Sequence, residues 1–317
     1  MACTPTDKKY GLLMGQSWPD EYPITASSSA GELVPENLLD LQPSRKWRSA
    51  STDDQTIEGS FRIMETQAVN RDRPVNMCVL AGNNLTKDNT VCLTLYNAIG
   101  DKVFGECVSG EFFEMGWGVQ PLGLFGLGGV WEDGSVIGAD ATQEQNISIE
   151  DIAVDPRLIG GLYTRYIDTD YIAFFFERVW ASRFEITVSD SGNPDGYMEI
   201  GRLKLGNAVE VFMAPGYEMG WRDTSSLTRT RSGALRSDNG RSYRYANVNT
   251  ILRHTQTNLS QIFRHTGLRS DVVWSAFPPA VTNEGRENLI LGRLTSYGAS
   301  HWTNEGVTTN FTIEEAI

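Results

Sequence analysis

Residues 180–206 constrain the fold of this chain more than any other segment does. Phe184, Ile186 and Val188 alternate with polar residues, which is typical of a β-strand that buries one face. The turn formers Asp-Ser-Gly-Asn-Pro-Asp-Gly follow, and a second alternating run then ends at Gly206. We therefore predict a β-hairpin at the edge or centre of a β-sandwich. The hairpin carries no catalytic pattern, which favours a binding or structural protein.

Further alternating runs lie upstream of this hairpin, so the chain carries an ordered set of strand motifs. In sequence order they are NLLDLQPSRKWRS, LAGNNLT, LTLYNAIGD and, within the hairpin, PDGYMEIGRLKLG. Taken together, these motifs resemble the discoidin-like, galactose-binding-type jelly roll in tail-tip and baseplate proteins of tailed bacteriophages. The resemblance covers residues 28–206 and implies a jelly-roll β-sandwich there. Within it, the apolar run of residues 172–176 predicts a central strand buried on both faces.

Residues 207–317 are predicted to form a smaller β-rich (α+β) domain. Strand patterns dominate it, and one helix is predicted near residues 256–267, where Leu259, Ile262 and Phe263 form an i, i+3, i+4 stripe. This region resembles, more weakly, the C-terminal parts of the same tail proteins, which implies an assembly domain. The predicted fold class is mainly β: a discoidin-like jelly-roll β-sandwich followed by a smaller β-rich C-terminal domain.

Two segments with little regular pattern carry large apolar side chains. Residues 1–27 are predicted to form an extended N-terminal arm, and residues 112–150 a Gly/aromatic-rich insertion in the sandwich. The insertion either closes the end of the sandwich core or forms a protein–protein contact patch. We expect neighbouring subunits to order both segments, because few aromatic side chains offset the entropy of a long irregular segment. The predicted interface residues are Trp18, Tyr22, Trp117, Leu124, Phe125 and Trp131.

The charge and the cysteines of the chain limit its partners and its environment. A formal net charge of −13 disfavours binding to the phosphate backbone of nucleic acids. No apolar run reaches the length of a membrane span, and the N-terminus lacks the apolar core of a signal peptide. Cys3, Cys78, Cys92 and Cys107 show no metal-ligand spacing, so we expect free, buried thiols in a reducing compartment.

Residues with catalytic or metal-binding chemistry are few. His254 and His265 would need a third ligand to hold a metal ion. We expect Asp190, Asn193 and Asp195 to form a turn, and a calcium ion on their clustered oxygens is the alternative. No nucleophile-elbow, phosphate-loop or dinucleotide-binding motif occurs in a suitable context. We therefore predict no enzyme activity, no catalytic residue, no metal site and no cofactor.

The resemblance implies a virion structural protein of a phage tail tip or baseplate that is assembled in the host cytoplasm. Its partners would be other tail and baseplate proteins and copies of itself in a homo-oligomer. The alternative is a carbohydrate-binding module that attaches to host-surface glycans through Trp47, Trp117 and Trp131, because such sites use aromatic side chains and a few polar groups. A glycosidase is the least supported function, since the sequence does not show how far apart its carboxylates lie.

Overall fold

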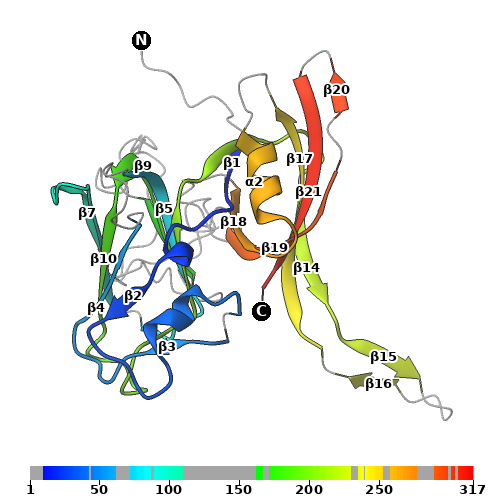
Figure 1. The fold of residues 1–317 in the computed structure, drawn as a ribbon. Helices are drawn as coiled ribbons and strands as arrows, with labels where there is room; N and C mark the ends of the chain where they lie inside the picture. Colours follow the sequence, from blue (N-terminus) through cyan, green and yellow to red (C-terminus); the bar gives the residue numbers. More distant parts are fainter. Residues whose placement is uncertain are drawn as a thin grey trace, which may run out of the picture.

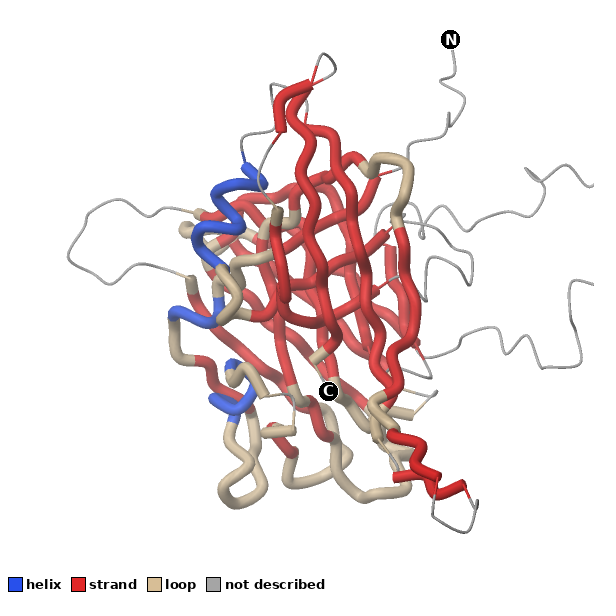
Figure 2. Tube along the Cα trace, turned by 90° about the vertical axis from the view of Figure 1, so that its right-hand side faces the viewer, coloured by secondary structure: helices blue, strands red, loops and turns tan. Residues whose placement is uncertain are grey.

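The computed structural model consists almost entirely of antiparallel β-strands, with one α-helix among the described residues (Figures 1 and 2). This confirms the predicted fold class, which is mainly β. None of the described helices is long and apolar enough to cross a membrane. The structure describes residues 10–42, 44–61, 72–86, 89–109, 162–166, 171–229, 235–238, 240–252, 258–276, 289–298, 301–303 and 306–316.

Two antiparallel sheets form a β-sandwich in the first two thirds of the chain. The five-stranded sheet has the order β2 (Ile24–Ala26), β4 (Gln55–Ser60), β10 (Arg183–Ser189), β6 (Thr90–Tyr96) and β7 (Lys102–Ser109). The four-stranded sheet has the order β12 (Arg202–Gly206), β5 (Arg73–Ala81), β9 (Tyr171–Ala181) and β8 (Leu162–Tyr166). Alternate residues of the two sheets meet in one buried core, for example Ile57, Leu93 and Phe184 with Leu80 and Phe174.

The predicted hairpin over residues 180–206 is wrong. β10 pairs with β4 and β6, whereas β12 pairs with β5 in the other sheet. Between them, β11 (Glu199–Ile200) pairs with β3 (Trp47–Arg48), so the opening and closing parts of the sandwich do lie together. The turn after residue 189 therefore carries the chain from one sheet towards the other. Alternation shows which face of a strand is buried, but it does not show which strand is the neighbour.

A third, larger sheet covers the other side of the four-stranded sheet. Its order is β13 (Val209–Phe212), β1 (Tyr10–Met14), β18 (Asp271–Ala276), β19 (Leu289–Tyr297), β21 (Gly306–Glu315), β17 (Ser242–Leu252) and β14 (Glu218–Asp223), with β20 (His301–Thr303) paired to β21. The predicted helix is α2 (Asn258–Thr266), which buries Leu259 and Phe263 against this sheet. Gly267 follows the last residue of α2, and its positive φ of 56° suits a residue without a Cβ atom.

The molecule is therefore a stack of three sheets and a helix. One face of the four-stranded sheet fills the sandwich core, and its other face packs on the large sheet through Met77, Val79, Phe175, Val273 and Leu291. The opposite face of the large sheet packs on α2. As predicted, residues 172–176 of β9 lie in a central strand, and residues 171–175 are buried.

The N-terminal arm belongs to this chain's own core over the described residues. β1 lies between β13 and β18, and Leu13 and Met14 are fully buried. Two short 3-10 turns, η1 (Pro19–Glu21) and η2 (Pro35–Leu39), follow it on the way into the sandwich. The expectation that a neighbouring subunit orders this arm is therefore wrong for residues 10–26. The insertion at residues 112–150 lies outside the described residues.

The prediction of free cysteines holds for Cys78 and is wrong for Cys92 and Cys107. Cys78 is buried and unpaired in the sandwich core, and burial raises the pKa of its thiol. Cys92 forms a disulfide with Cys107, directly across the β6–β7 pair. Placement on opposite strands brings the two sulfur atoms together although 15 residues separate them in sequence. Cys3 lies outside the described residues.

Candidate functional site: a projecting ribbon and its exposed edge

A two-stranded ribbon projects from the edge of the large sheet. β14 and β17 begin it beside the body, and β15 (Ser226–Arg229) and β16 (Leu235–Asp238) continue it outward (Figures 1 and 2). We call residues 218–247 the ribbon. β14 is the outermost described strand of its sheet, and four of its six residues are exposed. An outermost strand presents backbone groups that can pair with another strand.

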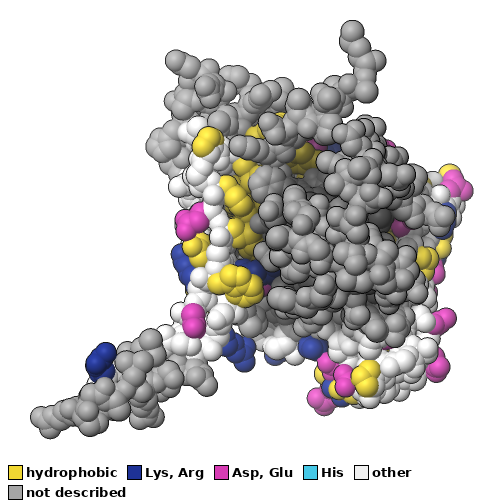
Figure 3. All heavy atoms as spheres, turned by 180° about the vertical axis from the view of Figure 1, so that it is seen from behind, with side chains coloured by type: hydrophobic (Ala, Val, Ile, Leu, Met, Phe, Trp, Pro, Cys, Tyr) yellow, Lys and Arg dark blue, Asp and Glu magenta, His cyan; other side chains and the backbone are white. Residues whose placement is uncertain are grey.

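The ribbon is basic, although the chain is acidic. Residues 218–247 contain six arginines and three acidic residues, so their formal charge is +3. The rest of the chain then carries −13 − 3 = −16. Viewed from behind, basic and hydrophobic side chains lie together where the ribbon leaves the body (Figure 3). The ribbon thus has the charge needed to approach an acidic surface.

One face of β14 carries opposite charges at its two ends. Glu218 accepts hydrogen bonds from the Tyr245 hydroxyl at 2.8 Å and from Asn247 at 3.2 Å. These two hydrogen bonds lower the pKa of the Glu218 carboxyl, which therefore stays ionised at neutral pH. Arg222 lies 4.5 Å from the ring centroid of Tyr245 and forms an ion pair with Glu314.

The other face of β14 carries apolar side chains. Met219 packs partly buried against the core beneath α2. Trp221 is 64% exposed, and its ring lies 5.8 Å from the guanidinium carbon of Arg244. A large aromatic residue that stays this exposed on an outermost strand is typical of a contact surface.

Buried polar contacts fix the base of the ribbon to the sandwich. Arg244 is only 2% exposed and donates from Nε to Glu315 at 3.1 Å. The hydroxyl of Tyr171, on β9, donates to the same carboxylate at 3.2 Å. Burial and the Glu315 charge raise the pKa of Tyr171, so the hydroxyl stays protonated and remains a donor. Through Glu315, the base of the ribbon is thus linked to β21 of its own sheet and to β9 of the four-stranded sheet.

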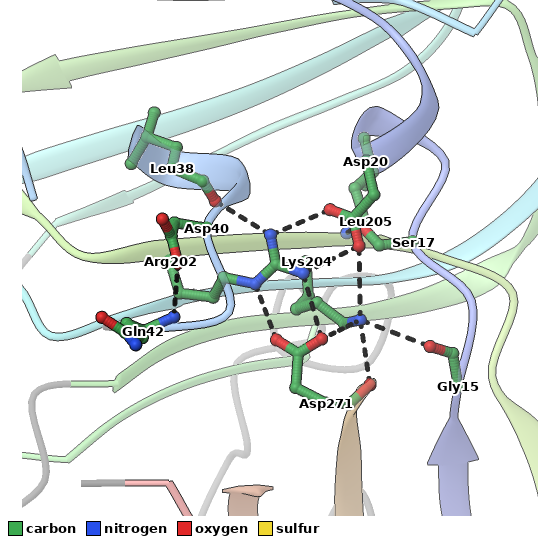
Figure 4. A network of polar contacts seen from close by, with 10 residues as sticks. All are labelled: Gly15, Ser17, Asp20, Leu38, Asp40, Gln42, Arg202, Lys204, Leu205 and Asp271. Carbon is green, nitrogen blue, oxygen red and sulfur yellow. Dashed lines mark hydrogen bonds and ion pairs between the residues drawn. The ribbon is translucent and has the colours of Figure 1, made fainter. Parts of the chain in front are cut away.

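A second polar network joins the arm, the sandwich and the large sheet (Figure 4). Arg202 donates from Nε to Asp271 at 2.7 Å and from Nη2 to Asp20 at 2.7 Å. Lys204 donates from Nζ to Asp271 at 3.0 Å. Arg202 and Lys204 are fully buried on β12, where they alternate with core residues Leu203 and Leu205. Two cations and two carboxylates balance their charges and hold the layers together.

The turn at residues 190–196 is explained by hydrogen bonds. Asp190 is 1% exposed and accepts from the backbone N–H and the hydroxyl of Thr86 and from Asn193. The Asn193 side chain in turn accepts from the backbone N–H of Asp195. These contacts occupy both carboxylate oxygens of Asp190 and the side-chain oxygen of Asn193, as a turn requires. In the part of the chain that the structure describes, no group of His, Cys, Asp and Glu could hold a metal ion. His265 is exposed on α2, and His254 lies outside the described residues.

Among the residues predicted as interface or glycan contacts, the structure describes Trp18, Tyr22 and Trp47, and all three pack in or against the sandwich core. Trp18 and Tyr22 pack partly buried on the sandwich, where the Trp18 indole N–H donates to the Pro74 carbonyl at 2.9 Å. Arg73 lies 4.6 Å from the Trp18 ring centroid and donates to the Tyr22 hydroxyl. Trp47 is fully buried, so it offers no surface on which a sugar could stack. Trp117, Leu124, Phe125 and Trp131 lie outside the described residues.

Two exposed tryptophans were missed by sequence reasoning. Trp221 lies on β14, and Trp180, near the end of β9, is 59% exposed. Alternation could not reveal either residue, since a tryptophan in a strand is ordinarily read as a core residue. The sequence signal for Trp221 is its position next to Arg222 in an arginine-rich segment.

No family model and no curated protein matches this sequence. A mutant lectin-binding domain of lectinolysin complexed with Lewis b is similar in structure, with 8% identity and a TM-score of 0.34, over 61% of this chain and 96% of that one. Chitosan-binding module 1 of a chitosanase/glucanase from Paenibacillus sp. IK-5 has 12% identity and a TM-score of 0.33, over 61% and 99%. The Clostridium perfringens module CpGH89CBM32-5, in complex with GalNAc-β-1,3-galactose, has 10% identity and a TM-score of 0.32, over 61% and 100%. Similarity at these TM-scores carries no argument about what this chain binds.

Proposed function

We propose that this chain is a non-catalytic subunit of a larger protein assembly and that the ribbon is its docking element. One observation carries the proposal: the ribbon leaves the body, is basic, and exposes an outermost strand with Trp221. A two-stranded ribbon is marginally stable by itself in water, so contact with a partner would stabilise it. Because the sequence resembles tail and baseplate proteins, we propose that this assembly is the tail tip or baseplate of a phage virion.

The body of the molecule suits this role because it holds the ribbon in a fixed direction. The Arg244–Glu315–Tyr171 contacts tie the base of the ribbon to β9, and the balanced charge network ties β12 to β18. A rigid support lowers the entropy cost of docking, since less of the surface must be ordered on binding. Specific contacts along the ribbon can then determine the partner.

Shortening the ribbon tests the proposal. Residues 225–240 are replaced by Asn-Gly, which forms a tight turn between paired strands, and exposed Trp221 is replaced by Ala in the same variant; Thr224 and Arg241 are already hydrogen-bonded to each other. The variant should keep the circular dichroism and melting temperature of the wild type but be depleted from purified virions, measured by quantitative mass spectrometry. The matched control is Ile99→Ser, at an 80% exposed position of the sandwich. Incorporation of the shortened chain at the wild-type level would refute the docking role.

Glycan recognition by the sandwich is the second candidate, and exposed Trp180 favours it. An exposed aromatic ring can stack on a sugar face. The wild type, the shortened-ribbon variant and Trp180→Ala are compared on an array that includes Lewis b, chitosan oligosaccharides and GalNAc-β-1,3-galactose. Binding that survives shortening of the ribbon but is lost in Trp180→Ala would establish this second function. An array with no binding by the wild type would remove it.

A further inference from the structure

We propose that two copies of this chain pair through β14, antiparallel, about a two-fold axis at Gly220. The pairing would join the two large sheets into one continuous sheet. This inference rests on the proposed assembly role and names the partner as a second copy of this chain.

β14 is available for such pairing. It is the last strand in the described order of its sheet, and β17 lies on its other side. Glu218, Trp221, Arg222 and Asp223 are exposed, and the six residues contain no proline. A strand that has exposed residues, no proline and a single neighbour among the described strands is of the kind that adds another strand.

The charges of β14 are self-complementary about an axis at Gly220, a register that pairs all six residues of the strand except Asp223 within β14. An axis at Gly220 places Glu218 opposite the partner's Arg222 and, by symmetry, Arg222 opposite the partner's Glu218. Residues paired across antiparallel strands share a face, so the opposite charges meet directly. A register shifted by one residue would set Glu218 opposite the partner's Asp223, which places like charges together. The charge pattern therefore favours the axis at Gly220 over the shifted register.

The apolar face fits the same register. Met219 lies opposite the partner's Trp221, and each exposed Trp221 ring gains an apolar neighbour across the axis. Gly220 stands at the axis itself, so no two side chains face each other there across the paired strands. A Cβ atom added at Gly220 would lie 3.2 Å from the Tyr245 ring of the same chain, so a larger residue would be crowded at this position. Both faces of the strand thus favour the same alignment.

The direction of the ribbon supports a second copy of this chain as the partner of β14. Antiparallel pairing sets Asp223 opposite the partner's Tyr217, so each ribbon continues past that point along the other copy. The ribbon carries +3 and the rest of the chain −16. Each basic ribbon would then lie against an acidic molecule, and the two contacts are equivalent by symmetry.

The test uses two charge reversals on the full chain, Glu218→Arg and Arg222→Glu. Either variant alone places like charges opposite each other across the axis, so its dimer should be about tenfold or more weaker than that of the wild type by sedimentation velocity. An equimolar mixture of the two variants restores opposite charges at both positions and should form the mixed dimer. The Arg222–Glu314 pair lost in Arg222→Glu is exposed and contributes little to folding.

The control is Glu210→Arg, at an exposed position of β13 on the opposite edge of the same sheet; it should dimerise like the wild type. A monomeric wild type, single variants that dimerise normally, or a mixture that stays monomeric would each overturn the pairing.

Failure of the pairing can be distinguished from failure of the proposed assembly role. If the ribbon is needed for virion incorporation but the wild type is monomeric, the partner is another protein and only this inference fails. If the wild type dimerises but the ribbon is dispensable in virions, the pairing stands and the assembly role fails.

Discussion

Replacing Asp271 by Asn tests whether balanced charges hold the layers together. The Asp271 carboxylate accepts from Arg202 at 2.7 and 3.0 Å and from Lys204 at 3.0 Å, and it is 2% exposed. The asparagine would leave two buried cations with Asp20 as their remaining carboxylate partner in the network. Removing one member of a buried ion pair costs about 3–5 kcal/mol, because the remaining charge is left uncompensated. We expect the free energy of unfolding at neutral pH to fall by that amount.

The pKa of Asp271 gives the pH dependence and its sign. Burial raises this pKa, but Lys204 and Arg202 outweigh burial and lower it from 3.8 to about 2. The difference corresponds to about 2 kcal/mol of stability. Because the folded pKa lies below the unfolded one, this stability is present above about pH 4 and is lost as pH falls through about 2. The Asn variant should lose less stability than the wild type between about pH 5 and pH 2.

Urea unfolding and calorimetry measure both effects. With an unfolding entropy of about 2.1 cal/mol/K per residue over 317 residues, a loss of 3–5 kcal/mol lowers the melting temperature by about 4–8 °C. Adding Lys204→Met restores the charge balance, so the double variant should be more stable than the sum of the two single changes predicts. Asp40→Asn, in the exposed pair with Arg45, is the matched control and should cost under about 1 kcal/mol. An unchanged melting temperature for Asp271→Asn, or strict additivity, would refute the reasoning.

Two further predictions concern the arm and the disulfide. Leu13→Ala should destabilise the isolated chain by about 2–5 kcal/mol in urea, because Leu13 is fully buried in the chain's own sheet; an unaffected isolated chain would mean that a neighbour orders the arm after all. Cys92→Ser with Cys107→Ser should cost about 3 kcal/mol, since the bond closes a segment of 15 residues. A reductant should bring the wild type down to the level of this variant without affecting the variant, and equal loss in both proteins would contradict the assignment.

The sequence predicted the features that depend on neighbouring residues. Phe184, Ile186 and Val188 are buried on one face of β10, and Leu259 and Phe263 anchor α2 as expected. In these cases buried residues recur with the period of the strand or helix, so a short stretch of sequence is enough to predict the element and its buried face. The fold class follows from the same patterns.

Pairing between distant segments could not be predicted in this way. Residues 184–188 and 203–205 both alternate, yet their strands belong to different sheets. Cys92 and Cys107 meet only because β6 and β7 pair in one particular register. The candidate site depends on the same kind of information: Trp221 is exposed because β14 is outermost, and strand order is a property of the whole sheet. The division of the chain at residue 206 stays a prediction.

The place of β1 in the large sheet has a consequence for how the chain acquires its structure during synthesis. Leu13 pairs with Trp274, which is 274 − 13 = 261 residues later, so β1 leaves the ribosome long before its neighbour β18. Contacts this distant in sequence slow folding, because the loop must close before the pair stabilises it. The sandwich strands are complete by residue 206 and can associate while the rest is still being made. Premature termination after the sandwich would leave β1 without either neighbour, exposing Leu13 and Met14 to aggregation.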